Sequence, residues 1–344
     1  MRLYQKVCAV IADEGMSGLS RRIVRKFFIT SEAISNDERA KVREDYERLV
    51  SDFNARALAM GYGDIKKYYW YHTVDLGNGL VTPGTYDYRK ALPRFQFPED
   101  MSGMNVLDVG SATGFFAFEF ERRGANVVSV ELPSIADWDM PHGKDRQLTL
   151  ENLMAYHQVG TIEEVQYFHL DAPFEFCRKA LNSKIRRCHS TIYDLSAQKL
   201  GVDAFDLIFV GDVLLHTFSP LRALVSIAPL CRGTLIISSD LANEGYGQPI
   251  MRYIGGEERS RDNRSWWIPN RSCLEKMLKR LGFKNVVVVG HHTGVLRPEG
   301  HVYDRSIIHA TNCERPLQLC TPPNHHSEVE VSHEQTATHH HAGV

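Results

Sequence analysis

The spacing of apolar residues changes along the chain, from a helical period to an alternation of strands and helices. Apolar residues in the first 66 positions recur three and four residues apart, which is the period of an amphipathic helix. Between residues 105 and 310, short apolar runs alternate with segments of helical spacing. This alternation predicts an α/β fold with a mainly parallel, seven-stranded sheet and helices on both faces. The predicted strands are 105–109, 126–131, 185–192, 205–210, 233–239, 285–290 and 304–310, and the predicted helices are 115–123, 173–182, 219–229 and 271–281.

Residues 1–66 are predicted to form an N-terminal helical region of three helices. The second helix, residues 19–27, is basic as well as amphipathic. Such a helix can lie on RNA or on a membrane, but we favour a solvated face packed on the main domain. The third helix should begin near Ser35, where acidic residues suit the positive end of a helix, and should end at Gly61. Its expected buried stripe consists of Val42, Tyr46, Leu49 and Phe53.

The main domain is expected to span residues 67–312. Within it, residues 134–172 are longer than a simple connection needs, so we expect an insertion near the ligand. Residues 313–344 are polar and low in complexity, which predicts a disordered tail. The tail contains six histidines, but their spacing does not define a metal site, and no metal is predicted.

Composition narrows the choice of compartment and partner. The chain has 344 residues, a formal net charge of −2 and a pI near 6.8, so it has no overall attraction to nucleic acid. Its seven cysteines are scattered and form no C-x-x-C pair, which indicates reduced thiols and a cytoplasmic location. No apolar run approaches the ~18 residues that span a bilayer, so stable membrane insertion is not expected. The oligomeric state is left open.

The most informative segment is Asn-Val-Leu-Asp-Val-Gly-Ser-Ala-Thr-Gly, residues 105–114. An apolar strand runs into a turn, and residues at helical spacing follow. Glycines in such a turn let the backbone approach a ligand closely. The next predicted strand ends in Glu131, where an acid suits the two hydroxyls of a ribose. The turn residues of interest are Asp108, Gly110, Ser111 and Gly114.

This turn reads D-x-G-x-x-x-G and resembles motif I of the class I S-adenosylmethionine (SAM) methyltransferases, which have a Rossmann-like fold. A dinucleotide turn would read G-x-G-x-x-G and direct a helix N-terminus at a pyrophosphate. SAM has no phosphate, and its amino acid end makes an acid inside the turn useful. We therefore favour SAM as the cofactor, with nucleotide binding or a degenerate fold as alternatives.

Three polar residues follow later strands and are candidates for chemistry. Asp194 follows the third strand, where it can accept a hydrogen bond from an adenine or cap a turn. Asp212 and His216 follow the fourth strand, beside the expected methyl donor. A histidine there can take a proton near neutral pH. The alternative is that His216 holds its loop through a hydrogen bond.

Two aromatic segments are candidates for the substrate site. The first is dense in glycine and aromatic residues, and suits either a cover over a sulfonium or a packed linker. The second joins arginine to aromatic surface, which suits a base or a sugar ring. Side chains alternate along an extended segment, so one of its two adjacent tryptophans is expected to face the substrate cleft. The candidates are Trp70, Tyr71 and His72 in the first segment, and Arg264, Trp266 and Trp267 in the second.

Four segments, taken in order, resemble the tRNA wobble-uridine methyltransferase-like family, which makes 5-methoxyuridine or 5-carboxymethoxyuridine. They are W-Y-H-T-V-D-L-G-N-G-x-V-T-P-G, L-D-V-G-S-A-T-G-F-F, G-D-V-L-L-H-T-F-S-P-L and W-W-I-P-N, within about residues 65–310. The resemblance implies a SAM-type donor and an oxygen acceptor. It assigns the donor to Asp108, Gly110 and Gly114, its ribose to Glu131 and its adenine to Asp194.

One departure bears on the donor. The carboxymethyl-transferring branch has a tyrosine before the histidine of the third segment, and that tyrosine helps to receive the donor's extra carboxylate. Here the position is Leu215, which favours plain SAM. Three functions stay open: a tRNA wobble-uridine O-methyltransferase, an O-methyltransferase acting on a glycan or small molecule, and a non-catalytic SAM-fold binding protein. A deep neutral or acidic pocket lined by Trp266 or Trp267 would favour the second.

Overall fold

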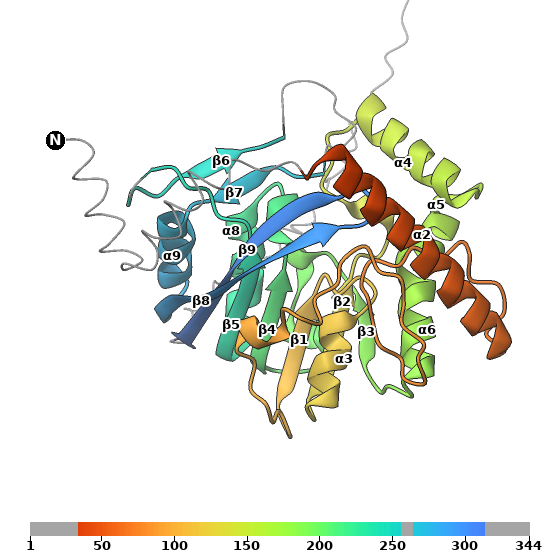
Figure 1. The fold of residues 1–344 in the computed structure, drawn as a ribbon. Helices are drawn as coiled ribbons and strands as arrows, with labels where there is room; N and C mark the ends of the chain where they lie inside the picture. Colours follow the sequence, from red (N-terminus) through yellow and green to blue (C-terminus); the bar gives the residue numbers. More distant parts are fainter. Residues whose placement is uncertain (1–33, 246, 256–263, 314–344) are drawn as a thin grey trace, which may run out of the picture.

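The computed structural model describes residues 34–245, 247–255 and 264–313. A seven-stranded sheet in the order β3-β2-β1-β4-β5-β9-β8 forms its centre (Figure 1). The first five strands in this order are parallel, and β9 pairs antiparallel with both β5 and β8. The predicted mainly parallel sheet is thus confirmed. The strands are β1 (Asn105–Val109), β2 (Asn126–Glu131), β3 (Arg186–His189), β4 (Phe205–Gly211), β5 (Cys231–Ser239), β8 (Phe283–Leu296) and β9 (His301–Cys313).

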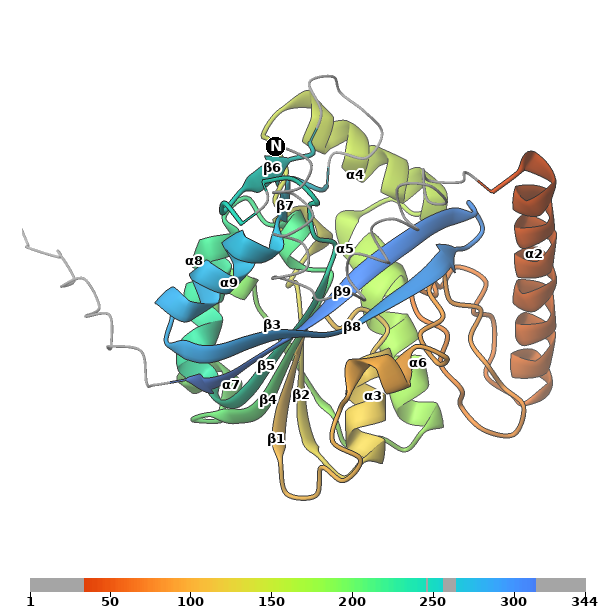
Figure 2. The same ribbon diagram turned by 60° about the vertical axis from the view of Figure 1, so that its left-hand side comes forward.

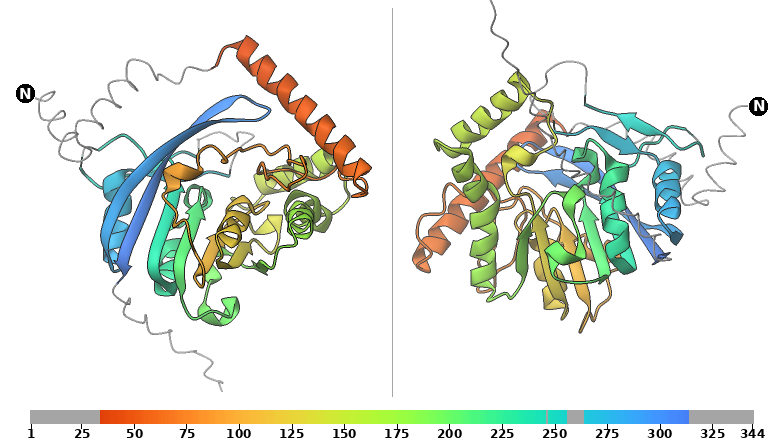
Figure 3. Two further views of the ribbon diagram at one scale, coloured as in Figure 1. Left: turned by 60° about the horizontal axis from the view of Figure 1, so that its bottom comes forward. Right: turned by 180° about the vertical axis from the view of Figure 1, so that it is seen from behind.

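Helices cover both faces of the sheet, as the alternating pattern predicts. Helices α3 and α6 lie on one side, and α8 and α9 lie on the other (Figures 2 and 3). Because side chains alternate along a strand, Val106 of β1 belongs to the first core and its neighbour Leu107 belongs to the second. The helices are α3 (Phe115–Arg122), α6 (Ala172–Ala180), α7 (Ala197–Leu200), α8 (Pro220–Ile227) and α9 (Arg271–Arg280).

Helix α2 (Asn36–Ala59) is the third helix predicted for the N-terminal region. A capping box at Ser35 and Glu38 starts it, as the local sequence indicates. Near its C-terminal end the helix is anchored by Phe53, which is 2% exposed and packs edge-on against Trp70, at 5.0 Å between ring centroids. Leu49 is 42% exposed, so the predicted buried stripe is wrong at this position. The whole of α2 runs along the outer edge of the fold (Figure 2), so part of its surface, including Leu49, stays exposed.

The predicted insertion is mainly helical. It contains α4 (Lys144–His157), α5 (Ile162–Gln166) and a π-helical turn, Tyr167–Asp171, that runs directly into α6. A short antiparallel pair, β6 (Met251–Tyr253) and β7 (Trp267–Pro269), was not predicted, because three-residue strands carry too little pattern. Short 3-10 turns lie at Leu92–Phe95, Ile135–Asp137, Ile192–Asp194, Leu214–His216 and Ala228–Leu230.

The first two predicted helices and the tail beyond residue 313 lie outside the described residues. Among the helices of the described ranges, none is both long and apolar enough to cross a membrane. The same ranges hold no cluster of three or more histidine, cysteine or acidic side chains that could bind a metal ion.

Candidate active site

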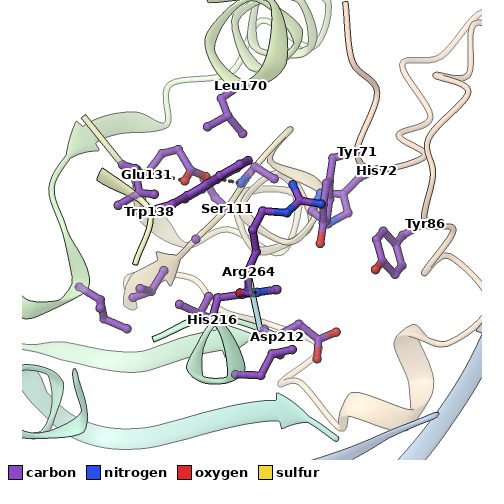
Figure 4. Close-up of a pocket in the computed structure, with 18 of the residues that line it drawn as sticks. Tyr71, His72, Tyr86, Ser111, Glu131, Trp138, Leu170, Asp212, His216 and Arg264 are labelled. Carbon is purple, nitrogen blue, oxygen red and sulfur yellow. Dashed lines mark hydrogen bonds between the residues drawn. The ribbon is translucent and has the colours of Figure 1, made fainter. Parts of the chain in front are cut away.

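A cavity of about 1080 Å³ lies at the carboxyl ends of the parallel strands. This is the edge at which open α/β sheets bind ligands. The walls come from β1, β2 and β4, from the segment before β1, from the insertion and from β9. Figure 4 shows several of the lining side chains. Nine of the residues singled out from the sequence line it: Tyr71, His72, Asp108, Gly110, Ser111, Glu131, Asp212, His216 and Arg264.

The two glycines of the turn after β1 have different roles. Both have a positive φ, +72° at Gly110 and +87° at Gly114. A Cβ on Gly110 would lie 2.5 Å from Cγ2 of Val213, so glycine lets the cavity floor approach the loop after β4. Gly114 lies outside the cavity lining and starts α3, where a Cβ would lie 2.7 Å from the Phe118 ring. It therefore shapes the turn without lining the cavity.

Asp108 places an unsatisfied carboxyl oxygen beneath the cavity. Its side chain is 2% exposed, and Oδ2 has no hydrogen-bond partner within the described part of the chain. Burial, followed by repulsion from Glu131, raises the pKa of Asp108 to about 7. A buried acceptor of this kind is suited to a cationic or N–H-bearing group of a ligand.

Glu131, at the end of β2, is held from two sides by backbone. Its Oε2 accepts from the Ala112 N–H at 2.7 Å, and its Oε1 accepts from the Leu132 N–H at 3.0 Å (Figure 4). The buried Arg187 was not singled out from the sequence. It donates to the Ala112 carbonyl at 2.9 Å, and its Nη2 lies 3.8 Å from Glu131 Oε2. These contacts fix the orientation of the acid at the cavity wall.

Asp194 does not line the cavity. Its side chain is exposed and accepts a hydrogen bond from Thr191 Oγ1 at 2.5 Å, which matches the alternative of a turn cap. Because the chain enters a 3-10 turn after β3, the residues directly after the strand reach the cavity and Asp194 turns away. The lining residues at this wall are Ser190, Thr191, Ile192 and Tyr193.

Asp212 and His216 both line the cavity at the loop after β4. Burial raises the pKa of Asp212 to about 6, although Arg305 acts in the opposite direction. Nδ1 of His216 lies 2.5 Å from the Arg264 carbonyl, and a carbonyl only accepts, so Nδ1 carries the proton. In the neutral ring, Nε2 then holds the lone pair. His216 therefore ties its loop to Arg264, and its other nitrogen is an acceptor.

The segment before β1 supplies an aromatic wall. Tyr71, His72, Tyr86 and Tyr88 line the cavity, whereas Trp70 points into the core. Burial lowers the pKa of His72 to about 3, so the ring is neutral. Trp70, predicted as a substrate residue, is thus buried in the core, and its neighbours Tyr71 and His72 line the cavity.

Neither adjacent tryptophan lines the cavity, so the prediction that one of them faces it is wrong. Trp266 is 5% exposed and donates to the Asp139 carbonyl at 2.8 Å, while Trp267 donates to the Phe218 carbonyl at 3.2 Å. Trp266 is buried and Trp267 is half-buried, and both indole N–H groups donate to backbone carbonyls of the chain. Trp138, from the insertion, supplies aromatic surface in the cavity instead, with the Arg264 guanidinium 5.0 Å above its ring.

The fold and this cavity define a Rossmann-like methyltransferase domain, and comparison with known proteins gives the family. The sequence matches the methyltransferase domain family over residues 84–288, more than half of the chain, and the protein belongs to this family. Methyltransferases of this fold take their methyl group from SAM. The buried acceptor of Asp108, the acid at the end of β2 and the glycine at the cavity floor fit that cofactor.

Curated relatives include tRNA U34 carboxymethyltransferases. The protein from Idiomarina loihiensis is 26% identical over 197 residues, which cover 57% of this chain and 50% of the relative. The protein from Pseudoalteromonas atlantica is 35% identical over 88 residues, covering 25% and 27%. The chain spans about half the length of most of the curated relatives that it matches.

Two solved structures to which the chain is similar hold SAM or its demethylated product. The N-terminal domain of EvdMO1 with bound S-adenosylhomocysteine (SAH) is 14% identical, with a TM-score of 0.41, over 76% of this chain and 96% of that one. Magnesium protoporphyrin IX methyltransferase from Synechocystis PCC 6803 with bound SAM is 15% identical, with a TM-score of 0.33, over 62% and 71%.

Proposed function

We propose that the protein transfers the methyl group of SAM to an acceptor oxygen, and that this oxygen is the 5-hydroxyl of a tRNA wobble uridine. The observation that carries the transfer is that Asp108, Glu131 and His216 line one cavity. Binding groups for a nucleoside with an amino acid end therefore share a space with a proton acceptor. The acceptor class follows the curated relatives, whose printed activity is modification of tRNA U34.

The donor-binding side of the cavity consists of the ends of β1, β2 and β3. Asp108 would receive the amino acid end, and Glu131 would receive the ribose hydroxyls. Leu132 and the residues after β3 would contact the adenine, in place of Asp194. Gly110 would keep the backbone low enough for the ligand to cross the strand ends. When bound, SAM supplies a methyl group activated by a positively charged sulfur.

The acceptor side consists of the loop after β4 and the aromatic wall. His216 Nε2 would take the proton of the acceptor hydroxyl, because Nδ1 is committed to the Arg264 carbonyl. A 5-hydroxyuridine oxygen is acidic enough to need little help from a base. The chain's main contribution is then to align the hydroxyl with the methyl group and to exclude water. Tyr71, His72 and Tyr86 would form the dry wall.

A glycan or small-molecule acceptor is less well supported. We expected that function to be accompanied by a pocket lined by Trp266 or Trp267, and neither tryptophan lines the cavity. The lining carries six acidic side chains and two arginines, and Arg305 is paired with Asp212, so the support for a tRNA acceptor comes from the curated relatives. A cytoplasmic location is part of the proposal, since tRNA is modified there.

The proposal is tested with cells that contain or lack the protein. Mass spectrometry of tRNA nucleosides and of extracted metabolites should show loss of a 5-methoxyuridine-type nucleoside when the protein is absent. Purified protein with methyl-labelled SAM should restore it on tRNA from the deficient cells. Unchanged tRNA nucleosides together with an altered metabolite would replace the tRNA proposal by a small-molecule one. No labelled product from either pool would indicate a binding protein without turnover.

A further inference from the structure

His169 lines the cavity, and its contact with a second histidine, His157, decides which of its ring nitrogens carries the proton. Nδ1 of His157 lies 3.0 Å from the Lys67 carbonyl, so Nδ1 must donate. Nε2 of His157 lies 3.0 Å from Nδ1 of His169. Burial lowers the pKa of both rings, to about 3 for His169, so both are neutral. Nε2 of His157 therefore accepts, and Nδ1 of His169 donates.

The second nitrogen of His169 is consequently a hydrogen-bond acceptor. His169 is 8% exposed and lines the cavity, and no residue in the described ranges forms a hydrogen bond with its Nε2. Its ring stacks on Tyr69, at 4.3 Å between centroids and an interplanar angle of 5°. The residue lies in the π-helical turn Tyr167–Asp171. Such turns are rare and occur frequently at functional sites.

A donor accompanies this acceptor. Arg264 also lines the cavity, over Trp138, and its charge is close enough to His169 to lower the pKa of the histidine further. A guanidinium carries five N–H donors and accepts nothing. Figure 4 shows the Arg264 side chain extending into the space between Trp138 and Tyr71. The cavity thus offers an acceptor and a donor between aromatic rings, which is the arrangement that recognises a flat heterocycle by its edge.

We propose that His169 and Arg264 read the edge of the acceptor base and select uracil: His169 Nε2 accepts the N3–H, and Arg264 donates to a neighbouring carbonyl. Cytosine has an acceptor at N3, which would face the lone pair of His169. The inference rests on the proposed function, because it concerns the acceptor of that reaction. It adds a specificity-determining residue from the insertion, held in its tautomer by His157.

Three short anticodon stem-loop RNAs test the inference, each with a 5-hydroxyl at the wobble base. The first carries 5-hydroxyuridine, the second 5-hydroxycytidine and the third 3-methyl-5-hydroxyuridine, which lacks the N3–H. Fluorescence anisotropy with SAH present should give at least about fivefold weaker binding for the second and third RNAs, as loss of one hydrogen bond predicts. Equal binding of all three would overturn the inference.

A variant assigns the effect to the residue. His169→Phe keeps a ring to stack on Tyr69 and removes the acceptor. It should bind the 5-hydroxyuridine RNA at least about fivefold more weakly and lose the discrimination against 5-hydroxycytidine, with SAH affinity unchanged. The matched control is His309→Phe, because His309 bonds to the Phe95 carbonyl outside the cavity lining. Loss of SAH affinity in the His169 variant, with RNA discrimination intact, would place the residue in the donor site and overturn the inference.

The outcomes separate this inference from the proposed function. If the wild-type protein binds and methylates none of the RNAs, the uridine acceptor is wrong and the inference falls with it. If it methylates the 5-hydroxyuridine and 5-hydroxycytidine RNAs equally well, the O-methyltransferase proposal stands and the reading of the base by His169 does not. The wild-type comparison requires no variant, so it decides the question even if His169→Phe does not fold.

Discussion

The Arg305 guanidinium and the Asp212 carboxylate form an ion pair in the cavity wall, with Nε 2.5 Å from Oδ1. Both side chains are largely buried, at 14% and 12% exposure. The pair joins β9 to the loop after β4, so the charge of Arg305 is already compensated. An arginine held in this way is poorly placed to receive a further carboxylate from a ligand.

The pair bears on the choice of donor. Leu215, which lines the same cavity, offers no hydrogen bond, so a carboxylate on the donor's methyl would be buried without a partner. We expect SAM to bind at least ~100-fold more tightly than carboxy-SAM, about 2.7 kcal/mol. Asp212→Asn should release the charge of Arg305 and reduce this preference. Competition binding with the two donors measures both; equal affinities in the wild type would mean that Arg264 or Arg305 receives the carboxylate.

Asp108 should make ligand binding dependent on pH. Its pKa in the folded protein, about 7, lies above the ordinary value of 3.8, so its contribution to stability is largest at low pH and is lost as the pH rises through 7. An ammonium group bound beside it favours the carboxylate and lowers that pKa. SAH affinity should therefore increase as the pH rises toward about 7, with release of a proton. Calorimetry in buffers of different ionisation enthalpy measures this release, and Asp108→Asn should abolish it.

Glu131 should contribute equally to the binding of SAM and SAH, because it faces the part that the two share. Glu131→Ala is expected to weaken both by ~1–3 kcal/mol, the usual effect of losing charge-assisted hydrogen bonds. Glu151→Ala, an exposed site on α4, is the control. Calorimetry that detects no binding by the wild type, or no change in the variant, would end the SAM assignment.

His216 should affect turnover more than donor affinity. His216→Ala is expected to lower kcat on the order of 100-fold, the low end for loss of a general base, because the acceptor oxygen is itself acidic. Raising the pH should recover part of the loss, as the acceptor ionises without help. His142→Ala, outside the cavity lining, is the control. An unchanged kcat would leave His216 with the loop-holding role that its contact with Arg264 already gives it.

Gly110 should be required for its contact as well as for its backbone conformation. Gly103 provides a matched comparison: its φ is +76°, against +72° at Gly110, and an added Cβ there would meet nothing within 4 Å. Alanine at either position costs about 1–3 kcal/mol of backbone strain. Gly110→Ala should lower the free energy of unfolding further, because its Cβ collides with Val213. Equal melting temperatures for the two variants would contradict this account.

The regular part of the fold could be read from the sequence because its signals are local. All seven strands of the sheet and four of its covering helices were predicted, since apolar runs and helical spacing record which faces are buried. Asp108, Gly110 and Glu131 were placed at the cavity for the same reason, because each lies at or just after the end of a predicted strand. The prediction that Leu49 is buried was wrong because an apolar face on α2 does not show how far the neighbouring layer extends.

The cavity was less predictable because distant segments build it. Trp138, His169 and Arg305 come from the insertion and from β9, and no local spacing marks them as neighbours of Asp108. Trp266 and Trp267 were predicted from local spacing to include a cavity residue, and neither is one. Alternation along an extended segment does not reveal what lies on each side of it. Asp194 lies outside the cavity lining because a turn of one residue more or less decides which side chain after β3 reaches the cavity.

The position of β9 in the sheet has a consequence for the order of assembly during synthesis. This last described strand lies between β5 and β8, and it contributes Arg305 to the cavity wall. Domains fold on the ribosome from the N-terminus. Until residues 301–313 have emerged and paired with β5, that strand is an edge of the nascent sheet. Asp212 also lacks its ion-pair partner, Arg305. A chain arrested before residue 301 therefore has the turn after β1 but an incomplete cavity wall.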